Sequence, residues 1–359
     1  MAWAFTRIMW LMVFGDTSGS VDEVNGPRFF SVYTFCKNED LFLHLFILVL
    51  CMEKCSIYKK MIDVVEMRNA FVSFNGRNIL DFPLHVPMGM PLVSFLKDTF
   101  KKYCILLEFV QKNSNLKSDI NVAKVQGLCD GIISVMERYC QGKTVTAYTD
   151  FKNKVMKEIF SDIPTIELQN ESFYRMRNIK GLHRKSDFFP LPLNLRHLAG
   201  GQRFSLPGYS CLYLGYSKEV CKKEVGNDGS VIEVSVKDGK VFKLLDLTFN
   251  DEDQDKFIKV WPLIAACYIV PFYCMRSKHV CKPETINFHE EYIIPQFLTC
   301  YIREEQPALS GIRYYTVQDT KLNPLNNEMK NVILFGNGTN VSSYDEFVDC
   351  FNWGNIYAC

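Results

Sequence analysis

The spacing of apolar residues changes near residue 163, and this change constrains the fold more than any other feature of the sequence. From about residue 90 to 160, apolar side chains recur every three or four residues, which is typical of amphipathic helices. Polar breaks at KNSNLKSD and QGKT divide this stretch into three helices whose apolar faces can pack together. We therefore expect a helical support or interaction domain over residues 52–162.

Short apolar runs follow this block. DIPTIEL, residues 162–168, has the composition of a linker. Six later runs have the length and residue types of strands: SFYRMR (172–177), CLYLG (211–215), VIEVSV (231–236), VFKLLDL (241–247), GIRYYTV (311–317) and NVILFGN (331–337). Two segments between them have a helical pattern, WPLIAACYIVPFYC (261–274) and EEYIIPQFLTCYI (290–302). Strands mixed with a few helices, without regular alternation, predict an α+β fold.

The composition argues against nucleic-acid and membrane-surface binding. The formal net charge is +1, so no general attraction to polyanions is expected. The fourteen cysteines form no CxxC pair and no zinc spacing with histidine, so we expect free thiols, no metal and a reduced cytoplasmic location. The apolar run LFLHLFILVLCM, residues 41–52, is shorter than the roughly 20 residues that a membrane span needs.

Residues 1–51 have no clear hydrophobic period, whereas Met52 opens the more regular segment MEKCSIYKK. The preferred interpretation is that translation begins at Met52. The alternatives are a small apolar element packed on the rest of the protein, or a segment that associates weakly with membranes.

The common phosphate-binding and hydrolase motifs are missing: the sequence has no GxxxxGK[ST], GxGxxG, HExxH or GxSxG. An arginine inside a strand needs an anionic partner, and its fork suits a phosphate or a carboxylate. Taken singly, such residues are more often surface arginines, core tyrosines or solvated carboxylates. The candidate site residues, all after residue 170, are Arg175, Arg203, Tyr213, Glu224, Thr316 and Asn331.

The order of these residues is more informative than any one of them. FYRMR is followed by GGQRFS-x-PG-x-x-CLYLG, by Glu224 eleven residues after Tyr213, and then by YIIPQ, GIRYYT and NVILF. This arrangement, over about residues 170–340, resembles the RES domain family. The resemblance implies a mixed-sheet fold like that of ADP-ribosyltransferases. The helical N-terminal region is an addition that the compact toxin members of the family lack. It also implies consumption of NAD, and in several members a toxin paired with an antitoxin.

The resemblance assigns roles to the six positions. Arg175 and Arg203 would hold the pyrophosphate or ribose of NAD, and Tyr213 would stack on the nicotinamide ring. Glu224 would orient the ribose hydroxyls and stabilise the developing positive charge, so Glu224, Tyr213 and Arg175 are the expected catalytic residues. Thr316 and Asn331 would hydrogen-bond the nicotinamide side or the ribose. Two departures stand out: Gln202 interrupts the family's Gly-Gly-Arg, and Thr316 replaces the usual serine.

The expected division of the chain is a poorly defined segment (1–51), a helical domain (52–162), a RES domain (163–345) and a C-terminal tail (346–359). The expected function is cleavage of the nicotinamide–ribose bond, with water, phosphate or a protein side chain as acceptor. The alternatives are a non-catalytic module that binds a nucleotide or a protein, and a membrane-associated effector. The resemblance further implies an antitoxin partner with a helix-turn-helix domain.

Overall fold

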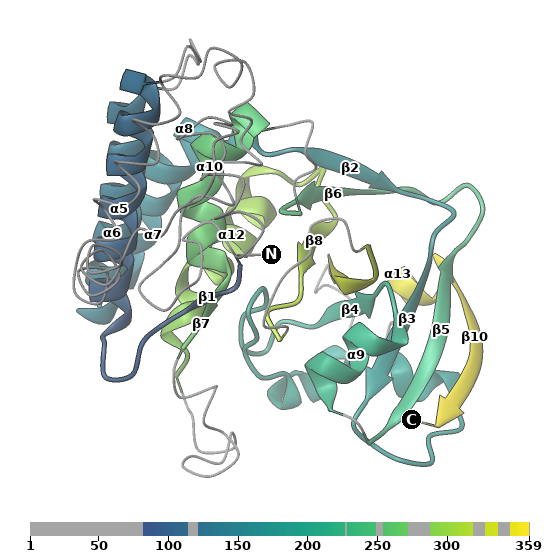
Figure 1. Cartoon of the computed structure of the whole chain (residues 1–359). Coiled ribbons are helices and arrows are strands. Elements are labelled where there is room, and N and C mark those ends of the chain that lie inside the picture. The colour runs from purple at the N-terminus through teal and green to yellow at the C-terminus, as the bar shows by residue number, and fades with distance from the viewer. Residues whose placement is uncertain are drawn as a thin grey trace, which may run out of the picture.

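The structure, a computed structural model, describes residues 82–113, 121–226, 228–248, 254–271, 288–318, 327–336 and 345–358. Helices gather on one side of the molecule and a mixed sheet lies on the other (Figure 1). The α+β class is therefore confirmed. The expectations for residues 1–51, for the run 41–52 and for a start at Met52 fall outside the described residues.

The three helices expected before residue 163 are present. They are α5 (Leu92–Asn113), α6 (Val122–Cys140) and a third segment made of α7 (Thr144–Asp150), a π-helical turn (Phe151–Met156), α8 (Lys157–Ile159) and a 3-10 turn (Phe160–Asp162). The side chain of Asn121 caps α6 by accepting a hydrogen bond from the Lys124 amide at 3.1 Å. Their apolar stripes are buried, as the period of three and four predicts.

Two later helices, α10 (Gln254–Cys267) and α12 (Ile293–Glu305), lie between these helices and the sheet (Figure 1). Trp261 of α10 is fully buried and stacks on Tyr103 of α5, with ring centroids 4.0 Å apart. One hydrophobic core therefore includes residues from both sides of the expected boundary at residue 162. That boundary separates a stretch with helical spacing of apolar residues from a stretch with strand-like runs, but the hydrophobic core extends across it.

Helix α10 differs from the helix expected over residues 261–274. It begins at Gln254, ends at Cys267 and contains Pro262. Pro262 has no amide hydrogen, so the Ile258 carbonyl loses its helical donor. The Tyr103 hydroxyl donates to that carbonyl at 2.7 Å instead. The helix cannot continue to residue 274, because the residue before Pro271 is biased towards extended backbone. Ile269–Val270 accordingly forms a short strand, β7, which pairs with β1 (Leu84–His85).

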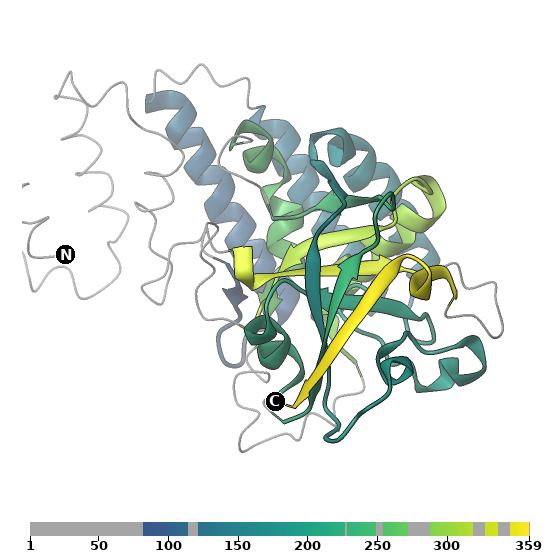
Figure 2. The ribbon, with the colours of Figure 1, turned by 90° about the vertical axis from the view of Figure 1, so that its right-hand side faces the viewer.

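The main sheet has eight strands in the order β10-β5-β3-β4-β9-β8-β6-β2, and only β6 and β8 run parallel as neighbours. Figure 2 shows the sheet from its own side, with the helices behind it. The bounds of β3 (Ser172–Arg177) and β4 (Cys211–Gly215) equal those expected. The other expected strands are also present, as β5 (Ser230–Val236), β6 (Phe242–Asp246), β8 (Gly311–Tyr315) and β9 (Lys330–Phe335).

Both edge strands correct the sequence interpretation. The supposed linker contains β2 (Thr165–Leu168), which pairs with β6. The supposed tail contains β10 (Phe351–Ala358), which pairs with β5. In β10, Phe351 and Trp353 are buried while Asn352 between them is exposed, which is the alternation of a strand with one face on the core. Burial of these two aromatic side chains fixes the end of the chain to the sheet.

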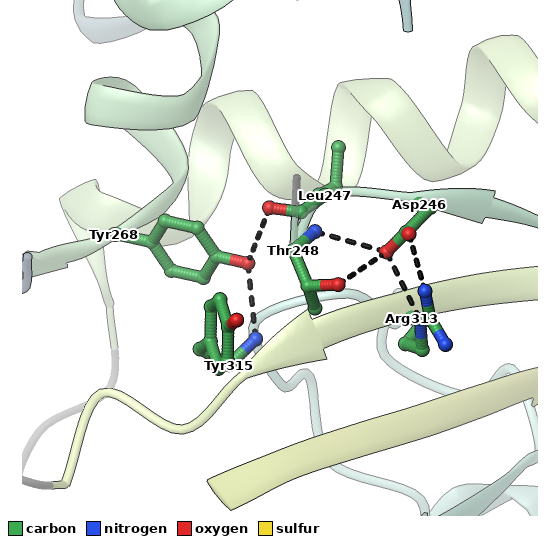
Figure 3. Close-up of polar contacts among 6 residues, drawn as sticks. All are labelled: Asp246, Leu247, Thr248, Tyr268, Arg313 and Tyr315. Carbon is green, nitrogen blue, oxygen red and sulfur yellow. Dashed lines mark hydrogen bonds and ion pairs between the residues drawn. The ribbon is translucent and has the colours of Figure 1, made fainter. Parts of the chain in front are cut away.

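A buried ion pair joins the two parallel strands (Figure 3). Arg313 of β8 is the register partner of Asp246 of β6, and its Nε donates to Asp246 Oδ1 at 3.0 Å, while Nη2 donates to Oδ2. The Thr248 amide and hydroxyl also donate to Oδ1, at 3.0 and 2.7 Å. Nearby, the Tyr268 hydroxyl donates to the Leu247 carbonyl at 3.2 Å and accepts from the Tyr315 amide at 3.0 Å. These contacts fasten the end of α10 to both strands.

Asp246→Asn is expected to lower the free energy of unfolding by about 3 to 5 kcal/mol, because it leaves the Arg313 cation buried without its anion. Urea unfolding of the two proteins measures this change. Asp98→Asn removes an exposed pair with Lys102 and is the matched control, with an expected loss below about 0.5 kcal/mol. Equal losses in the two variants would contradict a structural role for the Asp246–Arg313 pair.

Candidate functional site

A pocket of about 520 Å³ lies where β3, β4, β9, α9 and the loop before β4 meet. Five of the six expected site residues line it: Arg175, Arg203, Tyr213, Glu224 and Asn331. The sixth, Thr316, is fully buried and does not line the pocket, but its hydroxyl is close enough to Glu224 to act on the pKa of that carboxyl group. Residues that are up to 156 positions apart in the sequence thus converge on one cavity of a size that suits a small-molecule ligand.

The sheet opens at this pocket because β3 and β4 pair at one position, Tyr174 opposite Gly215. Beyond it, β3 continues along β5 and β4 continues along β9. The Tyr213 carbonyl is therefore not used by the β3 ladder, and Arg175 Nη1 donates to it at 3.0 Å. The guanidinium of Arg175 occupies the gap between the two strands.

Arg175 is a buried cation, 6% exposed. Burial lowers the pKa of its guanidinium well below the usual value, and the charge of Arg177 lowers it further. Among the described residues no carboxylate forms an ion pair with Arg175, and its Nε is buried without a hydrogen-bond partner. A buried charge without a counter-charge is costly, so the pocket favours a ligand that brings an anion.

Glu224 is positioned by α9 (Lys218–Val225), the short helix that follows β4. Ser217 is its N-cap, and the Ser217 hydroxyl accepts from the Val220 amide at 3.0 Å. The capped N-terminus therefore fixes the direction in which α9 leaves the sheet. The Glu224 carboxylate lies near the C-terminus of α9.

The Glu224 carboxylate accepts a hydrogen bond from Asn331 Nδ2 at 3.1 Å. Glu224 is an exposed residue that lines the pocket, and the pocket walls enclose it only in part. This enclosure raises the pKa of Glu224 above its usual value, while the Thr316 hydrogen bond, the Arg203 charge and the Asn331 hydrogen bond act in the opposite direction. The arrangement holds one carboxylate in a fixed orientation at the pocket, where solvent still reaches it.

Gly215, the last residue of β4, lets α9 approach the sheet closely. A Cβ at this position would lie 2.6 Å from Val220 Cγ1 and 2.7 Å from Cys221 Sγ. Both atoms are buried on α9 and belong to short side chains, so the helix itself would have to move. The absence of a side chain at Gly215 thus sets the distance between Glu224 and Asn331.

Gly215→Ala is expected to lower the free energy of unfolding by about 1 to 3 kcal/mol through overpacking. Gly127→Ala in α6 is the matched control, because an added Cβ there meets nothing within 4 Å. The control should be about 0.5 to 1 kcal/mol more stable than the unmodified protein, since alanine favours a helix interior. Urea unfolding measures both, and a Gly215→Ala protein as stable as the unmodified one would show that α9 does not depend on this contact.

Arg203 was expected to hold a phosphate or ribose, but in the structure its guanidinium contacts backbone carbonyls. Its Nη1 and Nη2 donate to the carbonyls of Cys267 and Ile269 at 2.9 and 3.0 Å, at the end of α10. Its guanidinium also lies 5.1 Å from the centre of the Tyr292 ring. A direct phosphate contact by Arg203 stays a prediction that this geometry does not favour. Its charge nevertheless reaches Glu224.

The loop that carries Arg203 explains how Gln202 fits into the motif. Gln202 and Ser205 exchange two backbone hydrogen bonds, at 3.0 and 3.1 Å, and close a tight turn around Arg203. Gln296 of α12, the last residue of YIIPQ, donates to the carbonyls of Gln202 and Ser205 at 3.0 and 3.1 Å. Gln202, the extra residue, is therefore part of a tight turn, and the hydrogen bonds from Gln296 of α12 stabilise this turn.

Tyr213 lies in the pocket wall, and burial raises the pKa of its hydroxyl well above the usual value. The hydroxyl is buried and makes no hydrogen bond of normal geometry with the described residues, although Ser205 lies close to it. Stacking of its ring on a ligand stays a prediction.

The sequence interpretation missed two residues of the pocket wall, Arg177 and Tyr292. Arg177 follows Arg175 by two positions in β3, so strand alternation could have identified it. Tyr292 lies within the HEEYIIPQ segment, and its ring stacks on His289 with centroids 4.5 Å apart. No local pattern distinguishes Tyr292 from a core tyrosine.

Other expectations concern metals, cysteines and membranes. Within the described ranges, no three His, Cys, Asp or Glu side chains gather in a way that could hold a metal ion. Cys104, Cys129, Cys211, Cys221 and Cys267 are buried free thiols. In the part of the chain that the structure describes, every helix is too short or too polar to cross a bilayer.

Comparison with known proteins adds one relationship. No family model matches the chain. The chain is 28% identical over 270 residues to a Bacillus subtilis (strain 168) protein named "Putative toxin YopC". The match covers 65% of this chain and 58% of that protein, so the chain spans less than two thirds of the relative's length. No solved structure matches the chain. The chain is thus similar to a protein whose name describes a toxin.

Proposed function

We propose that this chain is an NAD-consuming enzyme of the RES type that cleaves the bond between nicotinamide and ribose. The observation that carries the proposal is the Glu224 carboxylate, oriented by Asn331 at 3.1 Å in a pocket that also contains the buried cation Arg175. NAD brings an anionic pyrophosphate for the cation and a ribose for the carboxylate. Both groups of the pocket therefore have a partner in one ligand.

The chemistry requires stabilisation of a positive charge. When the N-glycosidic bond breaks, nicotinamide leaves with the bonding electron pair and the ribose becomes oxocarbenium-like. A carboxylate held beside that ribose lowers the energy of the transition state, and its effect is strongest in a poorly solvated cavity. Asn331 keeps Glu224 oriented, so little reorganisation is needed during the reaction.

Three acceptors are compatible with this chemistry. Water gives ADP-ribose, inorganic phosphate gives ADP-ribose 1''-phosphate, and a protein side chain gives an ADP-ribosylated protein; each reaction also releases nicotinamide. All three acceptors attack the same ribose carbon after the nicotinamide bond weakens. The pocket residues that we assign act on that common step.

We further propose that the protein acts as a toxin in the cytoplasm. The similarity to the Bacillus subtilis protein, whose name describes a toxin, supports this role. Depletion of NAD would account for toxicity. An antitoxin with a helix-turn-helix domain follows from the RES resemblance and belongs to the same proposal.

The test is NAD loss with identification of products. Purified full-length protein is incubated with NAD, with and without phosphate and with and without cell extract, and nicotinamide release is followed by chromatography. ADP-ribose identifies water as the acceptor, its 1''-phosphate identifies phosphate, and label on protein identifies a side chain. Absence of nicotinamide release under all of these conditions would contradict the enzyme and favour a binding module.

A further inference from the structure

Tyr314 of β8 lines the pocket and has no part in the chemistry assigned so far. It is the register partner of Asn331 on β9, and Asn331 is in turn the partner of Gly215 on β4. Directly paired residues of neighbouring antiparallel strands point to the same face of a sheet, with Cβ atoms about 5 Å apart. The side chain of Tyr314 therefore lies next to that of Asn331, which donates to the Glu224 carboxylate at 3.1 Å.

The ring of Tyr314 is held in place by packing. Tyr314 is 7% exposed, and its ring packs against that of the fully buried Phe204, with centroids 4.7 Å apart. Helix α12 holds Phe204 in turn, because the Thr299 hydroxyl donates to the Phe204 carbonyl at 2.9 Å. No hydrogen bond joins the Tyr314 hydroxyl to another residue in the described part of the chain. The packing thus orients a hydroxyl that keeps its donor for a ligand.

The surroundings of Tyr314 also keep its hydroxyl neutral. Burial raises the pKa of Tyr314 well above the usual value, and the negative charge of Glu224 raises it further. The tyrosine therefore offers an O–H donor at neutral pH. The ionised carboxylate of Glu224 can only accept hydrogen bonds, so the pocket wall presents a donor and an acceptor close together.

A neighbouring donor and acceptor select the chemistry of the ligand group that binds between them. A phosphate would be repelled by the Glu224 carboxylate, and a carbonyl group could use Tyr314 alone. A sugar hydroxyl can donate to Glu224 while it accepts from Tyr314, because a hydroxyl both donates and accepts. Two adjacent hydroxyls, as in ribose, satisfy the two side chains in the same way.

We propose that Tyr314 is a sugar-binding residue that acts together with Glu224, and that this pair makes the pocket selective for a ligand with a ribose at this position. The inference deepens the proposed function and rests on it for the identity of the sugar, which is the ribose bonded to nicotinamide in NAD. Tyr314 contacts the ribose hydroxyl before and during cleavage, so its effect falls on binding more than on the rate of the chemical step.

The test measures the dissociation constants of ADP-ribose and ADP for the full chain by isothermal titration calorimetry, because ADP-ribose carries the second ribose and ADP lacks it. The unmodified protein is expected to bind ADP-ribose at least about 10-fold more tightly than ADP, since contacts to the sugar are added. Tyr314→Phe should weaken ADP-ribose binding by about 3- to 10-fold and ADP binding by less than about twofold.

Tyr301→Phe is the matched control, because Tyr301 is 6% exposed, packs on Phe160 and does not line the pocket. It removes the same hydroxyl group and should leave both dissociation constants unchanged. Circular dichroism and thermal melting establish that both variants are folded. With NAD as substrate, Tyr314→Phe should raise KM by about 3- to 10-fold and change kcat by less than about threefold, a split that a purely structural defect would not produce.

Three outcomes would overturn the sugar contact: a folded Tyr314→Phe protein that binds ADP-ribose as Tyr301→Phe does, an equal loss of affinity for ADP-ribose and ADP, or an unmodified protein that binds ADP-ribose no more tightly than ADP or not at all. NAD consumption is assayed separately, so the two proposals can fail independently. A selective loss of ADP-ribose binding without NAD turnover in the unmodified protein would refute the enzyme but keep the sugar contact. NAD turnover with unchanged ADP-ribose affinity in folded Tyr314→Phe protein would do the reverse.

Discussion

Glu224→Gln is expected to lower NAD turnover by at least about 100-fold, because it removes the negative charge that stabilises the ribose cation. The substitution keeps the shape of the side chain and an oxygen that can accept from Asn331, whose Nδ2 lies 3.1 Å from the carboxylate. Binding of ADP should change little, because the proposed contact for its diphosphate is Arg175 and not Glu224. Nicotinamide release under saturating NAD measures the effect on turnover.

Because the pKa of Glu224 is raised, Glu224→Gln should also change how turnover and stability depend on pH. Its carboxyl group holds its proton to a higher pH in the folded protein than in the unfolded chain, because the pocket walls disfavour the charge. Turnover by the unmodified protein should therefore rise with pH through that raised pKa. Between the ordinary and the raised pKa the folded state binds more protons, so stability falls as pH rises. Glu224→Gln removes this loss and should be at least as stable at neutral pH.

Glu219→Gln is the matched control for Glu224→Gln, because it removes the same charge from the exposed first turn of α9. It should leave turnover and its pH profile unchanged. A Glu224→Gln protein with turnover within about threefold of the unmodified protein would refute the catalytic assignment. A Glu224→Gln protein that is much less stable would instead indicate that the carboxylate has a structural role.

Local patterns predicted the parts of the fold that local physics determines. The alternation in SFYRMR and CLYLG gives β3 and β4 with the expected bounds, and Ser217 begins α9 as its capping side chain suggests. Edge strands β2 and β10 were not predicted, because short pairs at the edge of a sheet depend on a partner strand that is distant in sequence. The Tyr103 hydroxyl that completes the hydrogen bonding of α10 also comes from 155 residues away.

In the candidate site, too, the sequence predicted some features, while others depend on contacts between distant segments. Order along the chain identified five residues of the pocket wall, and the structure brings them together. What order cannot give is the direction of a side chain: Arg203 faces backbone carbonyls, while Arg175 fills the gap where β3 and β4 separate. That gap arises from a single strand pairing between Tyr174 and Gly215, which no sequence period encodes.

Arg175→Met is expected to lower kcat/KM for NAD by about 100-fold or more, because the buried cation is the central contact for the ligand's anion. The same variant should melt within a few degrees of the unmodified protein when no ligand is present. Removing the guanidinium leaves the Tyr213 carbonyl without its donor, which costs about 1 to 3 kcal/mol. It also removes a buried charge that has no carboxylate partner among the described residues, which offsets much of this cost.

Thermal melting with and without ADP separates a ligand-binding arginine from a structural one. ADP should raise the melting temperature of the unmodified protein and leave that of Arg175→Met unchanged, since only a state that binds the ligand is stabilised by it. Arg138→Met, which removes a half-exposed arginine paired with Asp150 in the helical layer, should respond to ADP like the unmodified protein. If Arg175→Met unfolds on its own while ADP stabilises neither protein, the guanidinium serves to join β3 to β4. If stability is retained and the response to ADP is lost, the sheet opens at this position to bind an anion.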